Sequence, residues 1–184
     1  MEHVNDEELV RESIAGNRRF QEMLYKKFCW KMMGVCMRYA KNREEAEDFL
    51  QEGFVKVFIH LRTYKAQGAL EGWIRRVIVN TTLDALRKKS LMFKVVDIEE
   101  AEELHAEDFL GEVSVQDLVN MIQELAPGYR TVFNLFAVEG YTHKEIGVRL
   151  GISEGTSKSQ FAMARKILRE KIDEQEKELS LKKV

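Results

Sequence analysis

The chain has 184 residues, of which 45% are hydrophobic and 33% charged, and its formal net charge at pH 7 is −2. With one proline, this composition predicts a mostly helical protein made of one domain or two small ones. The apolar runs are far shorter than the ~20 residues that span a bilayer, and the acidic start is unlike a signal peptide. We therefore expect a cytoplasmic protein without membrane insertion.

Four helices are predicted in the first half of the chain. A short amphipathic helix covers residues 6–15, and Asn17 can cap a longer one that continues to Tyr39. Asn42 and Glu45 form a capping pair for a third helix, whose apolar stripe ends at Leu61. A polar stretch follows, and the fourth helix covers residues 70–89.

Gly53 lies inside the predicted third helix, where it costs ~1 kcal/mol relative to Ala. We expect this glycine to allow the close approach of a partner. In the second helix, Cys29 and Cys36 are seven residues apart and therefore share a face, so two buried thiols are favoured over a redox switch.

The second half begins with an acidic segment. Residues 95–129 contain ten Asp or Glu and no Lys or Arg, which leaves 29 basic against 21 acidic residues elsewhere. Two basic lobes are thus separated by an acidic linker, a distribution that a net charge near zero conceals. Ser114 can cap the next helix, Pro127-Gly128 ends it, and a further helix is expected over 130–138.

A helix-turn-helix is predicted from Thr142 onward. Thr142 and Glu145 form a capping box, Gly151 ends the first helix in a left-handed conformation, and Ser153 caps the second. Gly147 keeps the crossing of the two helices close. A turn this short leaves the second helix free to enter a DNA major groove. Its lysines and arginines can pair with phosphates, and Gln160 can form two hydrogen bonds with an adenine edge.

Two further groups of residues lie in the first half. Asp48, Gln51, Glu52 and Val55 recur at helical spacing on one face of the third helix, and Phe49 and Ile59 are expected to add exposed apolar surface. Such a face is either merely solvated or docks a basic partner helix. The loop over 62–68 and the helix after it are basic and contain Tyr64, a combination that suits single-stranded DNA. Trp73 has the spacing of a core residue rather than that of a stacking group.

Enzymatic chemistry has no support in these patterns. The four histidines lack metal-ligand spacing, and neither a catalytic triad nor a phosphate-binding loop is present. We expect no metal site, no cofactor and no catalytic residue.

The two lobes resemble the second and fourth conserved regions of bacterial sigma factors. The stretches that carry the first resemblance are Glu45–Phe58 and Gly72–Asp84, and those that carry the second run from Leu125 to Leu168. The order, with only a short linker between the two, is similar to the extracytoplasmic-function (ECF) group. The resemblance implies an all-α fold: a helical domain over 1–94, an acidic linker over 95–113 and a helix-turn-helix domain over 114–184.

The resemblance also implies roles and partners. The partners would be the β′ and β subunits of core RNA polymerase, which the chain joins as a monomer, promoter DNA and an anti-sigma factor. The polymerase-binding residues would be Asp48, Gln51, Glu52 and Val55. Those that melt and recognise the minus-ten element would be Arg62, Tyr64, Lys65, Arg76, Asn80, Arg87 and Lys88. Those at the minus-thirty-five element would be Thr142, Ser153, Thr156, Lys158, Ser159, Gln160 and Arg165.

The chain departs from the family pattern in the recognition helix, which is the second helix of the helix-turn-helix. Ser157 stands where the family usually has Val facing the hairpin core, and Phe161 is expected to fill the space that Ser157 leaves. Gln160 and Met163 stand where Arg is frequent, which indicates a distinct recognition sequence. The main alternative is a helix-turn-helix regulator that never joins polymerase, although that alternative leaves the first lobe unexplained.

Overall fold

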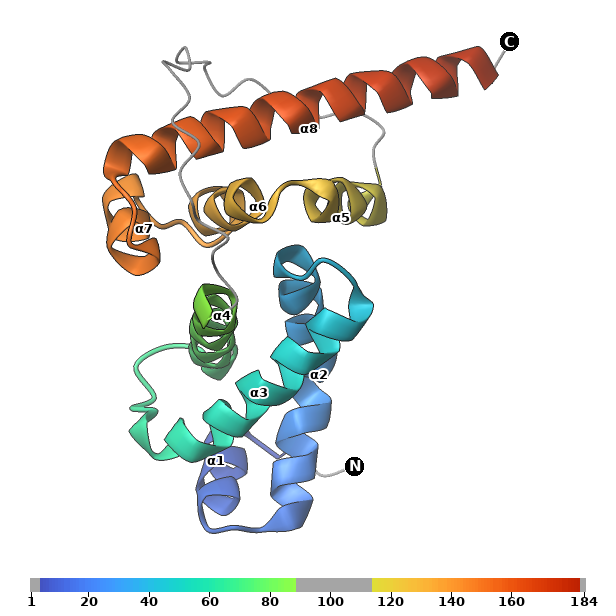
Figure 1. The fold of residues 1–184 in the computed structure, drawn as a ribbon. Helices are drawn as coiled ribbons and strands as arrows, with labels where there is room; N and C mark the ends of the chain where they lie inside the picture. The colour runs from blue at the N-terminus through green and yellow to red at the C-terminus, as the bar shows by residue number, and fades with distance from the viewer. Residues whose placement is uncertain (1–3, 89–113, 183–184) are drawn as a thin grey trace. The chain divides into compact units, whose positions relative to one another are not determined.

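The computed structural model describes residues 4–88 and 114–182, and these residues form helices and loops without a strand. The chain divides into two compact units, Met1–Lys88 and Lys89–Val184, drawn in Figure 1. The predicted all-α class is confirmed. The predicted acidic linker over 95–113 and the predicted domain end at residue 94 lie outside the described residues. Within the described part, no helix is long and apolar enough to cross a membrane.

The first unit contains the four predicted helices, and two predicted caps are present in it. The side chain of Asn17 accepts the amide N–H of Arg19 at 3.2 Å, and that of Asn42 accepts the amide N–H of Glu45 at 2.9 Å. These caps fix where the second and third helices begin. The elements are α1 (Asp6–Ile14), α2 (Arg18–Tyr39), α3 (Arg43–His60), the 3₁₀ turn η1 (Leu61–Thr63) and α4 (Leu70–Lys88).

Helices α3 and α4 approach each other closely at Gly53. A Cβ atom at this position would lie 2.8 Å from Cγ1 of Ile78, which is buried in α4. The glycine therefore serves the packing of two helices of the same unit, and the prediction that it admits an external partner is wrong. The prediction of two buried thiols is correct for Cys36 alone, because Cys29 is half-buried. Burial raises the pKa of the Cys36 thiol to about 12.

The second unit follows the predicted order with one shift. Its elements are α5 (Val115–Glu124), α6 (Pro127–Phe133), the π-helical turn η2 (Asn134–Val138), α7 (His143–Leu150) and α8 (Glu154–Lys182). Pro127 begins α6, whereas the sequence pattern predicts a start at Arg130. Proline is accepted at the first helical position because its missing N–H would have no intrahelical partner there.

Helix α8 is the long element of the second unit, and α5 and α6 lie along it (Figure 1). Ile122 and Leu125, at the end of α5, pack with Ala164 and Leu168 of α8 in one buried cluster. The first turns of α8 lie beside α7, so the same helix forms the recognition segment at its beginning and the spine of the unit further along.

Candidate nucleic-acid and partner interfaces

The predicted partner-binding face of α3 is exposed to solvent. Asp48, Gln51 and Glu52 are exposed, and Val55 keeps 57% of its surface accessible. Ile59, one turn further, keeps 61%. The prediction that Phe49 adds to this surface is wrong, because its ring is buried in the core of the first unit. Carboxylates and an amide beside exposed aliphatic side chains form a surface on which a basic amphipathic helix can dock.

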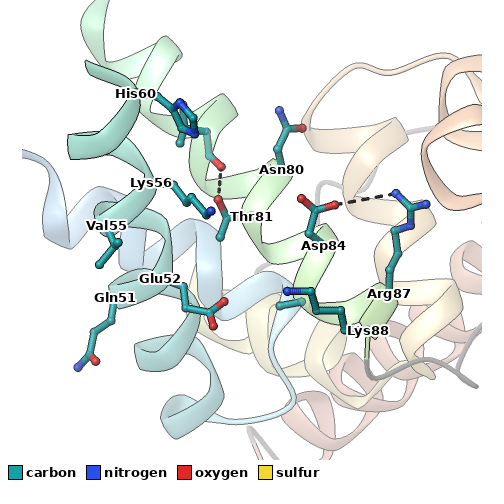
Figure 2. Close-up of a pocket in the computed structure, with 12 residues that line it drawn as sticks. Gln51, Glu52, Val55, Lys56, His60, Asn80, Thr81, Asp84, Arg87 and Lys88 are labelled. Carbon is teal, nitrogen blue, oxygen red and sulfur yellow. Dashed lines mark hydrogen bonds and ion pairs between the residues drawn. The ribbon is translucent and has the colours of Figure 1, made fainter. Parts of the chain in front are cut away.

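An open groove between α3 and α4 brings two of the predicted residue sets together. Figure 2 shows side chains from both helices around it. Gln51, Glu52 and Val55 of the α3 face line one side, and Asn80 of α4 lies on the other. The remaining lining residues include Lys56 and His60 on α3, and Thr81, Asp84, Arg87 and Lys88 on α4. A partner on α3 and a strand beside Asn80 would therefore occupy neighbouring positions.

The groove contains charges of both signs and two internal contacts. The Thr81 hydroxyl donates to the carbonyl oxygen of Val77 at 2.8 Å, and an Arg87 nitrogen lies 3.9 Å from the Asp84 carboxylate (Figure 2). The hydroxyl of Thr81 is thus engaged by its own helix. Arg87 is exposed, and its ion pair is long, so its guanidinium can turn to a phosphate at little cost.

Tyr64 organises the basic loop between α3 and α4. Its hydroxyl donates to the carbonyl oxygen of Gly68 at 2.7 Å, and its ring centroid lies 5.7 Å from that of Trp73. Gly68 has a positive φ of 125°, a conformation that residues with side chains rarely adopt. Trp73 is half-buried against Tyr64, between the core position that its spacing predicts and a fully exposed stacking group. The contacts of Tyr64 with Gly68 and Trp73 therefore hold the loop in a closed conformation without bound nucleic acid.

Cations project from this closed loop and from α4. Arg62 and Lys65 in the loop are exposed, as is Arg76 one turn beyond Trp73. At the end of α4, Lys88 is exposed beside Arg87. Exposed cations around an aromatic pair are the arrangement with which proteins track an unpaired strand.

The helix-turn-helix has the predicted geometry. Thr142 and Glu145 form a reciprocal capping box at the start of α7, and Gly151 ends that helix with a φ of 71°. A Cβ atom at Gly147 would lie 2.8 Å from the carbonyl oxygen of Ile152, so the tight turn requires glycine there. Ser153 caps α8 by accepting the amide N–H of Thr156 at 2.9 Å.

The predicted recognition residues differ in exposure. Thr142, Ser153 and Lys158 are exposed, whereas Thr156, Ser159 and Arg165 are half-buried. Gln160 is only 9% exposed, and its amide is directed at Gly128 of α6. The expectation that Gln160 contacts a base edge is therefore corrected: its side chain packs inside the unit.

His143 belongs to none of the predicted sets of site residues. Its ring stacks on Phe136 with centroids 4.2 Å apart and lies 5.7 Å from the ring of Phe161. Its Nδ1 lies 3.0 Å from Oγ of Ser157, which is fully buried. Burial, and then the charge of Lys158, lower the pKa of His143, while Glu154 raises it by less. A serine at a core position of the hairpin was the available signal that a polar partner is near.

Comparison with known proteins identifies both units. Residues 24–91 match the family model "Sigma-70 region 2", and residues 116–168 match "Sigma-70, region 4". The chain is 30% identical over 156 residues to the ECF RNA polymerase sigma factor SigW of Bacillus subtilis. This match covers 77% of this chain and 83% of that protein. It is 31% identical over 142 residues to the ECF RNA polymerase sigma factor SigE of Mycolicibacterium smegmatis. This match covers 74% of this chain and 55% of that protein.

A solved structure shows the same fold. The sigma factor RpoE, in complex with the anti-sigma factor NepR from Bartonella quintana, matches with a TM-score of 0.51 and 19% identity. The match covers 83% of this chain and 96% of that one. Two sigma regions in the expected order, together with relatives of this identity, favour a sigma factor over a regulator that never joins polymerase. The chain belongs to the ECF RNA polymerase sigma factors and is a transcription initiation factor.

Proposed function

We propose that this sigma factor joins core RNA polymerase through the exposed face of α3. It opens and recognises the minus-ten element at the α3–α4 groove and the basic loop, and binds the minus-thirty-five element as duplex with the beginning of α8. The observation that carries the proposal is the groove, because residues predicted for polymerase and residues predicted for the minus-ten strand line it together. A strand opened there would be held next to the enzyme that copies it.

The proposed polymerase contact is made by Asp48, Gln51, Glu52 and Val55, with Ile59 extending the apolar end. Its partner is the coiled coil of the β′ subunit. The β subunit binds the second unit, and each polymerase binds one copy of this chain. The exposure of all four side chains and their position on one helical face support this assignment. Chemistry remains with the polymerase, since this chain supplies specificity and strand opening.

The proposed minus-ten contact divides into two kinds of residue. Arg62, Lys65, Arg76, Arg87 and Lys88 pair with phosphates of the displaced strand, which fixes its path without sensing sequence. Asn80 lies in the groove, where a polar amide can contact the edge of an unstacked base. Tyr64 holds the loop in shape through Gly68 and packs on Trp73.

The proposed minus-thirty-five contact uses the exposed end of the helix-turn-helix. Lys158 is the exposed cation on the first turns of α8, and Thr142, Ser153, Thr156, Ser159 and Arg165 lie near it in the hairpin. The hydroxyls of Thr142 and Ser153 are engaged as caps, so they fix helix ends that face phosphates rather than sense bases. Gln160 is left out of this set.

Run-off transcription with core polymerase tests the proposal. The chain is expected to give promoter-specific transcripts, and Asp48→Arg is expected to abolish both the transcripts and co-purification with core enzyme. Glu7→Arg is the matched control, because it makes the same change of charge at an exposed position of α1 that belongs to no predicted contact. Polymerase binding that survives Asp48→Arg would contradict the assignment of the α3 face.

We also propose that an anti-sigma factor regulates this chain in the cytoplasm by covering the same α3 face. Support comes from the exposure of Val55 and Ile59, which invites a competing partner when polymerase is absent. Such a regulator should lose affinity for the Asp48→Arg variant in a pull-down, as polymerase does. Retained binding by the variant would place the regulator elsewhere.

A further inference from the structure

Helix α8 continues well past the region that matches the family. The region-four match ends at residue 168, whereas α8 runs to Lys182. On this extension the side chains of Lys171, Ile172 and Gln175 are half-buried, whereas Asp173 and Glu174, between them in sequence, are exposed. The spacing of the half-buried residues defines one helical face, and this face is directed at α5.

Two polar contacts join the extension to α5. The ammonium group of Lys171 pairs with the carboxylate of Glu124 at 2.5 Å, in the last turn of α5. Ser114 and then Gln175 lower the pKa of Asp117, in the first turn, so the side chain of Gln175 interacts with this carboxylate. Asp117 also accepts the hydroxyl of Ser114 at 2.7 Å. Since Ser114 is the cap of α5, the extension reaches the point at which the chain enters the helices of the second unit.

Among the side chains that the structure describes, few others cover the beginning of α5, although Val119 is half-buried. It has 10 residues, and isolated helices shorter than ~12–15 residues are marginal in water. Its described buried residues, Ile122 and Leu125, are at its end. Leu118, nearer the beginning, keeps 38% of its surface exposed, and Gln116 and Asn120 are exposed as well. The first turns of α5 therefore depend on the extension of α8.

We propose that the extension of α8 determines which spacings between the two promoter elements this sigma factor accepts, because it holds α5 folded and so fixes where the chain enters the second unit. The inference rests on the proposed function, in which the two units bind the two elements. Lys171 and Gln175 are the positioning residues, and neither needs to touch DNA.

Unfolding of α5 would lengthen the connection between the two units by several base pairs of duplex. A helix of 10 residues spans about 15 Å, and the same residues extended span at most about 35 Å. Release of α5 would add up to ~20 Å of reach, which corresponds to roughly six base pairs of duplex. A connection of greater reach tolerates a wider range of distances between two tethered sites.

Charge reversal at the ion pair is the test. Lys171→Glu places two carboxylates opposite each other, and Lys177→Glu is the matched control, because it makes the same charge change at an exposed position of the extension. Glu124→Lys combined with Lys171→Glu restores the attraction. A chain truncated after Arg169 removes the extension, and the point variants keep the test valid where the truncated chain fails to fold.

Two measurements are made, both on the full-length point variants and the second also on the truncated chain. Amide hydrogen exchange over residues 116–121 is expected to be at least about tenfold faster in Lys171→Glu, unchanged in Lys177→Glu and restored in the double variant. In run-off transcription with core polymerase, templates with the spacer lengthened or shortened by about three base pairs are compared with the best template. The preference for the best spacer is expected to fall at least about threefold in Lys171→Glu and in the truncated chain.

The outcomes are distinguishable. An unchanged exchange rate in Lys171→Glu, or an unchanged spacing preference in variants whose α5 exchanges faster, would overturn this inference alone. Absence of promoter-specific transcripts from the unmodified protein would overturn the proposed function, and this inference with it.

Discussion

Oγ of Ser157 lies 3.0 Å from Nδ1 of His143, inside the helix-turn-helix. The hydroxyl belongs to the beginning of α8 and the imidazole to the first turn of α7, so this polar contact joins the two helices of the hairpin. Phe136 and Phe161 flank the imidazole. Aromatic rings thus pack around the imidazole that contacts Ser157, and the expectation that Phe161 fills the space beside this serine stays a prediction.

The contact between Ser157 and His143 should contribute measurably to stability. Ser157→Ala removes the hydroxyl and leaves a half-buried ring nitrogen without this partner, which is expected to lower the free energy of unfolding of the second unit by about 1–2 kcal/mol. Urea denaturation followed by circular dichroism measures the change. Lys144→Ala, at an exposed position of α7, is the control and should change stability by less than about 0.5 kcal/mol. Equal stability of the two variants would contradict the role of this contact.

The stability of the second unit should depend on pH through His143. Burial and Lys158 lower its pKa in the folded state, so protonation favours the unfolded chain. The contribution is fully present above the unfolded value of 6.5 and is lost as the pH falls through the lowered folded value. Urea midpoints at pH 7.5 and about 5 are expected to differ more in the wild type than in His143→Gln. An identical pH dependence would show that other groups cause the loss.

Gly53 offers a test in the first unit. Gly53→Ala gains helix propensity of ~1 kcal/mol but forces a methyl group to within 2.8 Å of Ile78. Overpacking costs about 1–3 kcal/mol, so we expect a net loss of stability. Gly72→Ala is the matched control, since Gly72 is also helical and a Cβ atom there has no neighbour within 4 Å. Thermal melting should show Gly53→Ala below and Gly72→Ala at or above the wild type; a stabilised Gly53→Ala variant would show that α4 shifts without cost.

Tyr64 allows the structure of the loop to be separated from its charge. Tyr64→Phe keeps the ring against Trp73 but removes the hydrogen bond to Gly68, so the loop should lose its closed form. We expect promoter opening, detected by permanganate reactivity, to fall about three- to tenfold, in line with the loss of a hydrogen bond worth roughly 1 kcal/mol. Binding to core polymerase should be unchanged. Unchanged opening would show that the ring of Tyr64, rather than its hydroxyl, matters.

The sequence predicted the local structure more accurately than the packing. Capping boxes, Gly151 and the apolar stripes depend on residues a few positions apart, and the helices they predict are present. The predictions for the surroundings of Gly53, Phe49 and Gln160 are wrong, because each of these residues packs against parts of its unit that are distant in sequence. Gly53, for example, lies against Ile78. His143 was not recognised for the same reason, since its partner Ser157 lies 14 residues away on another helix.

The recognition helix provides the last prediction, a comparison of Lys158 with Gln160. Lys158 is exposed and pairs with Glu154 at 2.9 Å, so Lys158→Ala should weaken binding of minus-thirty-five duplex and reduce the dependence of log affinity on log salt by about one. Gln160 is buried against Gly128, so Gln160→Ala should lower the stability of the unit and leave the preferred base sequence unchanged. Fluorescence anisotropy with a panel of single-base duplex variants, at several salt concentrations and well below the melting temperature, measures both effects. A changed base preference in Gln160→Ala would show that this side chain leaves its buried site when DNA binds.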